Sequence, residues 1–432
     1  MSVIEKVKLM KQVAAQTLIP TQNPIHCCSY ADNPPHHSPL HIMSSGRSIP
    51  TEDRISDLPE SILCHILSFL PTKSAATTMI LSKRWKPVWL AILILNLDDK
   101  AFNDFETFRK FVYSIMFSLR DQKTSIQSFT LKLGYYSRFK QGELNRIFKF
   151  VMQRGVNNLN FDLSSKPHCI KLPSCILSCK TLQVLRLENI KMWDFDEVNF
   201  PCLKTLHLNK VDFTSPKYFA KFLYGCPILE DLNAKSRTFQ KSIDPMENLN
   251  ALPKLVKVRI CYNTDIPMSL VCKTRILHIE QIWGMTWKPL PMFHNLTHME
   301  LTFWISLLKR ECRSLIEKLP HFPNLQHFNI KLNFMNIRGA TYICSECSKV
   351  VPPNPTIAPE CLSSQLKTLS IQCSTDTKNI NNCEFQFVKY IMQHSKVLET
   401  VRVKSTRLKT NQMFMKLSSC TRSSPTCKLL FG

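Results

Sequence analysis

The 432-residue chain has little glycine, with eight residues at positions 46, 134, 142, 155, 225, 284, 339 and 432. Their spacing allows neither the G-x-G-x-x-G fingerprint of dinucleotide-binding folds nor the G-x-x-x-x-G-K-[ST] phosphate loop. The sequence also lacks G-x-S-x-G and H-E-x-x-H. We therefore predict no catalytic residues and no enzyme.

Long hydrophobic runs are missing as well. The longest strongly apolar run, Val88 to Leu97, is about half of the roughly 20 residues that a membrane span needs. Near the N-terminus, Val13 to Ile19 includes Gln16 and Thr17 and is too short for a signal peptide. We expect a soluble protein of the cytoplasm or nucleus, with no membrane contact. Its 18 cysteines should be reduced thiols, acting as small apolar side chains where buried.

Standard metal-ligand spacing is absent. Cys344-x-x-Cys347 has no second pair. Residues 1–50 are rich in proline and polar residues without a hydrophobic period, which predicts a flexible tail, and Met43 offers a second candidate start. The Cys and His residues of the tail match no zinc pattern; they are Cys27, Cys28, His36, His37 and His41. We predict no metal and no cofactor.

Positive charge is abundant but scattered. Lys and Arg number 56 against 32 Asp and Glu, giving a net charge of +24. A nucleic-acid partner would use such charge to neutralise phosphates. No run of five basic residues occurs and no nucleic-acid-binding motif is apparent. Nucleic-acid binding therefore remains a minor alternative.

Residues 53–97 predict short helices. Asp57 and Glu60 form a capping-box-like start, Pro71 ends the first helix, and Thr72 and Ser82 can cap two more. The first helix is apolar on two stripes, one of Leu58, Ile62, Ile66 and Phe69 and one of Leu63, Leu67 and Leu70. A segment this short cannot cover so much apolar surface alone. The surplus either packs on the following domain or docks a partner.

The segment DRISDLPESILCHILSFLPTKSAATTMILSKRWKPVW resembles the F-box motif, with Ser74 and Met79 as mild departures. The resemblance implies docking onto a Skp-family adaptor and, through it, a cullin. The residues implied in that surface are Leu58, Pro59, Ile62, Ile66, Leu67, Leu70 and Trp85. Nearby basic residues either steer toward an acidic adaptor or form a solvated face; these are Lys73, Lys83, Arg84 and Lys86.

From residue 126 onward a short apolar pattern recurs, as in Leu182-Gln-Val-Leu-Arg-Leu187. Its central apolar residue falls at 129, 159, 185, 206, 232, 258, 277, 299, 328, 369 and 401. The mean interval is about 27 residues, within the roughly 20–29 of leucine-rich repeats. The last two intervals are longer. We expect a solenoid with parallel strands on its concave face.

Side-chain alternation tests this expectation. In every unit the central residue and the one two positions later are apolar, and the residue between them is polar. The polar row should line the open face and bind a target protein, with these candidates: Arg186, His207, Asn233, Arg259, His278, Glu300 and Asn329. With one open-face neighbour on each side, the row holds eight basic and five acidic residues. This mixture suits a protein surface better than a phosphate backbone.

The C-terminal region carries a second resemblance. Ala358-Pro-Glu-Cys-Leu-Ser-Ser364 and Arg422-Ser-Ser-Pro-Thr-Cys-Lys-Leu-Leu-Phe431 resemble the FBD domain, which accompanies F-boxes and leucine-rich repeats in plant proteins. Phe387, Val388, Tyr390 and Ile391 suggest a helix before a strand at 398–403. We expect this region to close the open end of the stack, whose last strand would otherwise expose an edge.

The expected organisation is an α/β chain with a tail over 1–50, a three-helix F-box over 51–98, a leucine-rich-repeat solenoid over 99–350 and an FBD domain over 351–432. The function that follows is a non-catalytic adaptor of a ubiquitin ligase of the SCF (Skp–cullin–F-box) type. Its F-box would dock the Skp adaptor and its repeats would hold an unknown target. An F-box scaffold outside the ligase is an alternative.

Overall fold

The structure is a computed structural model. It describes residues 55, 57–91, 94–120, 125–134, 137–163, 170–235, 250–261, 266–282, 290–304, 314–333, 358–373, 382–405 and 415–431. The chain divides between Ile94 and Leu95 into an N-terminal and a C-terminal compact unit, each treated by itself below. The predicted tail over 1–50 and the Cys344–Cys347 pair lie outside the described residues. In the described part, no helix combines the length and apolar character needed to cross a membrane.

The N-terminal unit is built from short helices. They are α2 (Glu60–Ser68), α3 (Thr72–Thr77), the 3-10 turn η1 (Thr78–Ile80) and α4 (Trp85–Leu90). The predicted side-chain caps are wrong. Helices α2, α3 and α4 begin after Pro59, Pro71 and Arg84, none of which caps with a side chain. Two of the three starts therefore rely on proline, whose fixed φ suits a helix start and which has no N–H to satisfy.

A small apolar core holds these helices together. Leu63 and Leu67 of α2 pack with Val88 and Trp89 of α4, all at most 2% exposed. The Arg84 guanidinium donates to the Leu58 carbonyl oxygen at 2.5 Å and so joins the start of α4 to the segment before α2.

The C-terminal unit is organised around one sheet of thirteen described strands in the order β1-β2-β3-β4-β6-β8-β9-β10-β11-β12-β13-β14-β15. The pairings from β2 to β15 are parallel. The strands are β1 (Ile94–Asp98), β2 (Ser128–Lys132), β3 (Asn158–Asp162), β4 (Val184–Glu188), β6 (Thr205–Asn209), β8 (Asp231–Lys235), β9 (Lys257–Cys261), β10 (Ile276–Ile282), β11 (His298–Trp304), β12 (His327–Asn333), β13 (Thr368–Cys373), β14 (Thr400–Ser405) and β15 (Lys428–Phe431). A second, two-stranded sheet pairs β5 (Lys191–Met192) with β7 (Asp212–Phe213).

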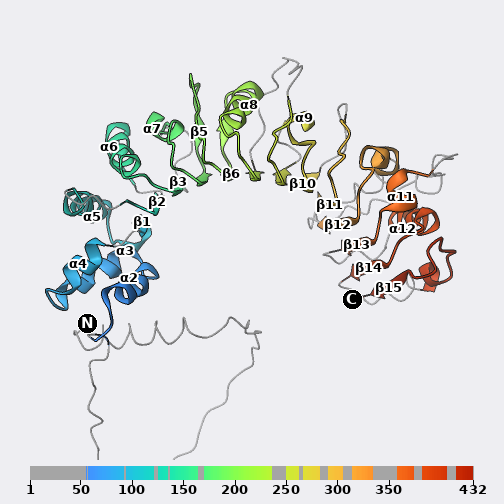
Figure 1. The fold of residues 1–432 in the computed structure, drawn as a ribbon, viewed down its shortest axis with the longest axis horizontal. Helices are drawn as coiled ribbons and strands as arrows, with labels where there is room; N and C mark the ends of the chain where they lie inside the picture. Colours follow the sequence, from blue (N-terminus) through green and yellow to red (C-terminus); the bar gives the residue numbers. More distant parts are fainter. Residues whose placement is uncertain are drawn as a thin grey trace, which may run out of the picture. The chain divides into compact units, whose positions relative to one another are not determined.

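The helices that connect successive strands lie on one side of the large sheet (Figure 1). They are α5 (Phe105–Ser118), α6 (Gln141–Met152), α7 (Ser174–Leu177), α8 (Pro216–Tyr224), α9 (Met268–Val271), α11 (Glu360–Ser364) and α12 (Asn382–His394), with the 3-10 turns η2 (Asp99–Ala101) and η3 (Leu319–His321). Phe148 of α6 shows how they pack. Its ring meets those of Phe129 on β2 and Phe161 on β3 at centroid distances of 5.9 and 4.7 Å.

The predicted alternation of the strands is confirmed. All 22 apolar residues assigned to the inner face, from Phe129 to Val403, are at most 2% exposed. Each lies beside its equivalent on the neighbouring strand, as Leu185 does beside Leu206. Two strands of the large sheet were not predicted, β1 at its start and β15 at its end, and neither were β5 and β7 of the small sheet. The core is thus one continuous apolar layer between the strands and the helices.

The C-terminal region extends this same sheet. Helix α11 begins after Pro359, and α12 buries the four predicted residues Phe387, Val388, Tyr390 and Ile391. Burial raises the pKa of the Cys361 thiol, at the start of α11, to about 12. We expected this region to cover the open end of the stack. Instead, strands β13, β14 and β15 extend the sheet. The short strand β15 is itself the edge, because it pairs only with β14 among the described strands.

Candidate protein-binding surfaces

The N-terminal unit exposes a set of large apolar side chains. Ile62 is 45% exposed, Phe69 60%, Met79 38% and Ile80 72%. Met79 and Ile80 belong to η1, Ile62 to α2, and Phe69 follows the last residue of α2. We call these four residues the apolar patch. Large apolar side chains left exposed on a short helical unit are candidates for contact with another protein.

The seven adaptor-binding residues predicted from the sequence occupy different environments. Pro59 and Ile62 are exposed, and Leu58, Ile66 and Leu70 are half-buried. Leu67 and Trp85 are 0% and 6% exposed. These two side chains pack inside the unit, and their contribution to a docking surface stays a prediction. Adaptor binding by the other five stays a prediction.

The sequence prediction missed three members of the apolar patch. Phe69 was within reach of sequence reasoning, since it lies on the same helical stripe as Ile62 and Ile66. Met79 and Ile80 carried no such signal, because the 3-10 turn that exposes them interrupts the helical period. Of the basic residues nearby, Lys73, Lys83 and Lys86 are exposed.

The second surface is the side of the large sheet opposite the helices, which we call the open face. The predicted polar row runs across it in unbroken register from Thr130 on β2 to Arg402 on β14. All seven predicted target-binding residues lie in this row as strand-to-strand neighbours. Arg186 is exposed and the other six are half-buried. Their role in binding stays a prediction, but their placement side by side is observed.

Ion pairs tie the middle of the open face together. Glu280 lies 2.7 Å from the Lys235 ammonium and 3.6 Å from the Arg259 guanidinium. Asp231 lies 3.8 Å from the Lys257 ammonium. Because these groups are partly exposed, each pair is worth at most about 1 kcal/mol. Their main effect is to cancel charge over β8, β9 and β10.

Glu300 on β11 links the polar side chains of β10 to those of β12. Its carboxylate accepts a hydrogen bond from the Lys331 ammonium at 2.8 Å and lies 3.4 Å from His278 Nδ1. Burial would raise the pKa of Glu300, but Lys331 and His278 together hold it below its usual value. Burial lowers the pKa of His278, a shift that Glu300 opposes and Arg259 supports. Burial and the charge of Arg186 likewise lower the pKa of His207.

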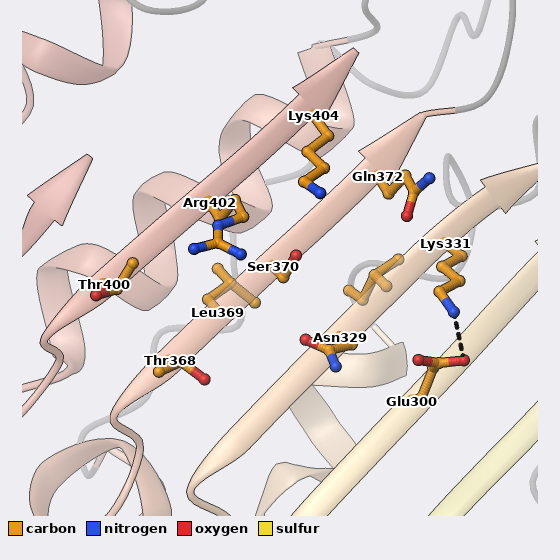
Figure 2. Close-up of a pocket in the computed structure, with 11 residues that line it drawn as sticks. Glu300, Asn329, Lys331, Thr368, Leu369, Ser370, Gln372, Thr400, Arg402 and Lys404 are labelled. Carbon is orange, nitrogen blue, oxygen red and sulfur yellow. Dashed lines mark hydrogen bonds and ion pairs between the residues drawn. The ribbon is translucent and has the colours of Figure 1, made fainter. Parts of the chain in front are cut away.

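A recess of about 430 Å³ opens on the face over β11 to β14 (Figure 2). Two predicted residues, Glu300 and Asn329, lie at one side of it. The rest of its lining comes from later positions of the polar row and their neighbours, which were not predicted as binding residues: Ile330, Lys331, Thr368, Leu369, Ser370, Gln372, Thr400, Arg402 and Lys404. Over the described part of the chain, no three His, Cys, Asp or Glu side chains converge as metal ligands would.

Family models match three parts of the chain. The F-box domain model matches residues 55–91, which span the helices of the N-terminal unit. A model described as "FBD-associated F-box protein At5g56370, LRR repeats" matches residues 144–250, and the FBD model matches 354–403.

Two relatives that match along most of the chain carry both F-box and FBD in their names. The chain is 27% identical to the F-box/FBD/LRR-repeat protein At5g56420 of Arabidopsis thaliana over 88% of its own length and 99% of the relative's. Identity to the FBD-associated F-box protein At5g56370 of the same plant is also 27%, over 88% and 100%. A shorter match reaches 38% identity, to the F-box/LRR-repeat protein At4g14096 over 42% of this chain and 39% of the relative.

The chain therefore carries matches to F-box, leucine-rich-repeat and FBD models, and it is similar along most of its length to plant F-box/FBD/LRR-repeat proteins.

Proposed function

We propose that this protein is the substrate-recognition subunit of an SCF-type ubiquitin ligase. The apolar patch on the N-terminal unit carries the proposal, because it lies within the segment that the F-box model matches. In this role the chain performs no chemistry of its own. It joins a target to the subunits that transfer ubiquitin, in the cytoplasm or the nucleus.

The F-box would dock a Skp-family adaptor, and through it a cullin, with the patch as the contact. Aliphatic and aromatic side chains at the centre of an interface supply most of its binding free energy once water is excluded. The buried residues Leu67 and Trp85 have a supporting role, since they hold the helices that present the patch. The exposed lysines at 73, 83 and 86 would speed association with an acidic adaptor.

The C-terminal unit would hold the target. We take its sheet and helices as a leucine-rich-repeat solenoid, with the open face as its concave side and the FBD strands as its last units. Half-buried, ion-paired polar residues keep such a face hydrated, and a protein partner can displace this water when it binds.

A pull-down with a purified Skp adaptor tests the first half of this proposal. The double variant Ile62→Asp, Ile80→Asp places charge on the patch without opening the core, and we expect it to lose adaptor binding. The matched control is Phe117→Asp, Met415→Asp, which changes two side chains 76% and 69% exposed in the C-terminal unit. Equal retention of the adaptor by both double variants would refute docking through the patch.

Affinity purification after proteasome inhibition tests the second half. The intact protein is compared with a chain lacking residues 53–91, which removes the helices of the N-terminal unit and leaves β1 in place. Both keep the sheet, so both should retain target proteins. Only the intact chain should co-purify cullin and show ubiquitin-modified targets that accumulate under inhibition. If neither form enriches any protein, target binding by the open face is contradicted.

A further inference from the structure

Charge on the open face is separated along the sheet. All five acidic side chains that β2 to β14 place on the face lie on strands from β3 to β11, and each has a partner there or next to it. They are Asp162, Glu188, Asp231, Glu280 and Glu300. The sequences of β12, β13, β14 and β15 contain no Asp or Glu. The face therefore changes from compensated to basic after β11.

Strand register sets the later polar residues in a regular grid. Asn329, Ser370 and Arg402 form one row across β12, β13 and β14, and Lys331, Gln372 and Lys404 form the next. A third row holds His327, Thr368 and Thr400, where His327 Nδ1 lies 2.8 Å from the Thr368 hydroxyl. All nine side chains are polar, and none is acidic.

The basic groups of the grid face the recess described above (Figure 2). Lys331 is paired with Glu300 at 2.8 Å. Arg402 and Lys404 are exposed, and among the described residues no carboxylate lies within ion-pair distance of either. Hydroxyl and amide groups surround them. Such a site offers positive charge together with donors and acceptors for a polypeptide backbone.

We propose that this recess binds an acidic, extended segment of the target protein. Arg402 and Lys404 would pair with its carboxylates, and Ser370, Gln372 and Asn329 would hydrogen-bond its backbone. The recess volume of about 430 Å³ lies within the roughly 300–1,000 Å³ of typical ligand sites. The inference rests on the proposed target-binding role of the open face and adds the chemistry of the partner.

The spacing of the two free cations favours an extended chain. Arg402 and Lys404 are two residues apart on β14, so their Cα atoms lie about 6.7 Å apart. Side chains on one face of an extended peptide repeat at the same interval. A segment with acidic residues at alternate positions can therefore place neighbouring carboxylates at both cations. A duplex phosphate backbone would instead need a longer basic track, which the acidic residues on β8 to β11 interrupt.

Fluorescence anisotropy with the full-length protein tests the inference. The probe is a labelled peptide of alternating Gly and Asp, compared with alternating Gly and Asn and with a labelled oligothymidylate. We expect the acidic peptide to bind, the neutral peptide not to bind, and the affinity to fall as salt is added. Oligothymidylate should bind more weakly than the acidic peptide.

Two variants of equal net charge locate the site. Arg402→Gln, Lys404→Gln should weaken binding of the acidic peptide roughly five- to thirtyfold, as two exposed ion pairs predict. Lys396→Gln, Lys416→Gln changes exposed lysines outside the grid and should leave the affinity unchanged. The reversed variant Arg402→Glu, Lys404→Glu should reject the acidic peptide and bind a Gly–Lys peptide instead. Because all these positions are exposed, circular dichroism should show native folding throughout.

Three results would overturn the inference: no binding of the acidic peptide, equal loss in both Gln variants, or tighter binding of oligothymidylate through Arg402 and Lys404. The last would make the recess a phosphate site. None of these results bears on adaptor docking, which the pull-down measures separately. Loss of adaptor binding would in turn leave the peptide result standing.

Discussion

The two units of this protein differ in how completely they cover their apolar side chains. In the C-terminal unit, each strand of the large sheet from β2 to β14 turns at least two apolar residues inward, and those assigned from the sequence are at most 2% exposed. In the N-terminal unit, Ile62, Phe69, Met79 and Ile80 remain at the surface. A large repeated sheet can cover its apolar face, whereas a few short helices cannot. Exposed apolar side chains therefore point to a partner more strongly in the N-terminal unit than in the C-terminal unit.

The sharpest test of this contrast is a cavity in the C-terminal core. Phe148→Ala removes a ring that contacts Phe129 and Phe161 between α6 and the sheet. We expect the free energy of unfolding to fall by about 3–5 kcal/mol, as for other buried phenylalanines. Denaturant unfolding measures it. Phe117→Ala on α5 is the control, because that side chain is 76% exposed and should change stability by less than about 0.5 kcal/mol. Similar losses in both variants would contradict the assignment of Phe148 to the core and of Phe117 to the surface.

Within the N-terminal unit, buried and exposed residues should separate stability from binding. Leu67→Ala empties a 0% exposed position and should cost about 2–5 kcal/mol of folding free energy. Phe69→Ala should leave the unfolding transition almost unchanged but weaken adaptor binding by at least about 1 kcal/mol. Thermal unfolding and a binding titration, run on both variants, give the comparison. A Phe69→Ala variant that unfolds early but binds normally would reverse our assignment of the two positions.

Two glycines test how tightly the C-terminal unit packs. A Cβ on Gly225, at the end of α8, would stand 2.6 Å from the Val198 carbonyl oxygen, so Gly225→Ala should destabilise by about 1–3 kcal/mol. A Cβ on Gly142 in α6 meets nothing within 4 Å, so Gly142→Ala should stabilise by about 0.5–1 kcal/mol. Differential scanning calorimetry should show shifts of opposite sign. A shared sign would show that helix packing is not the cause.

The smallest expected effect is a pH dependence of stability that comes from His278 in the polar row of the open face. Burial lowers the pKa of His278, which faces Glu300 on β11 and Arg259 and Lys257 on β9, below its usual 6.5. The unfolded chain therefore binds a proton first as pH falls, and stability declines below about pH 6.5. Unfolding midpoints at about pH 7.5 and pH 5.5 measure the decline. His278→Gln should reduce it without abolishing it, because burial also lowers the pKa of His207. An unchanged decline would exclude His278 as a contributor.

Sequence reasoning succeeded where burial alone decides the structure. The apolar–polar–apolar pattern located the strands of the large sheet from β2 to β14 and their register, because a slip of one residue would turn Leu185 or Leu206 to water. It missed β1, whose alternation around Asn96 lies at the end of a longer apolar run. It also missed β15, where Leu429, Leu430 and Phe431 show no polar residue between them.

The surfaces were harder to predict than the core. In α2 the apolar residues surround the helix, so the sequence did not show that Leu67 would be inside and Ile62 outside. The recess depends on Lys331 and Lys404 coming within two strands of each other, although 73 positions separate them in the sequence. The sequence alone does not predict this proximity, because it depends on the register of β12, β13 and β14.

The register of the polar row separates recognition from folding. Each strand brings its own side chain to the row, while the residues before and after it hold the core. A substitution at one row position thus alters one point of the surface and leaves the interior as it was. The same backbone can therefore present a different combination of side chains whenever a few of these positions change.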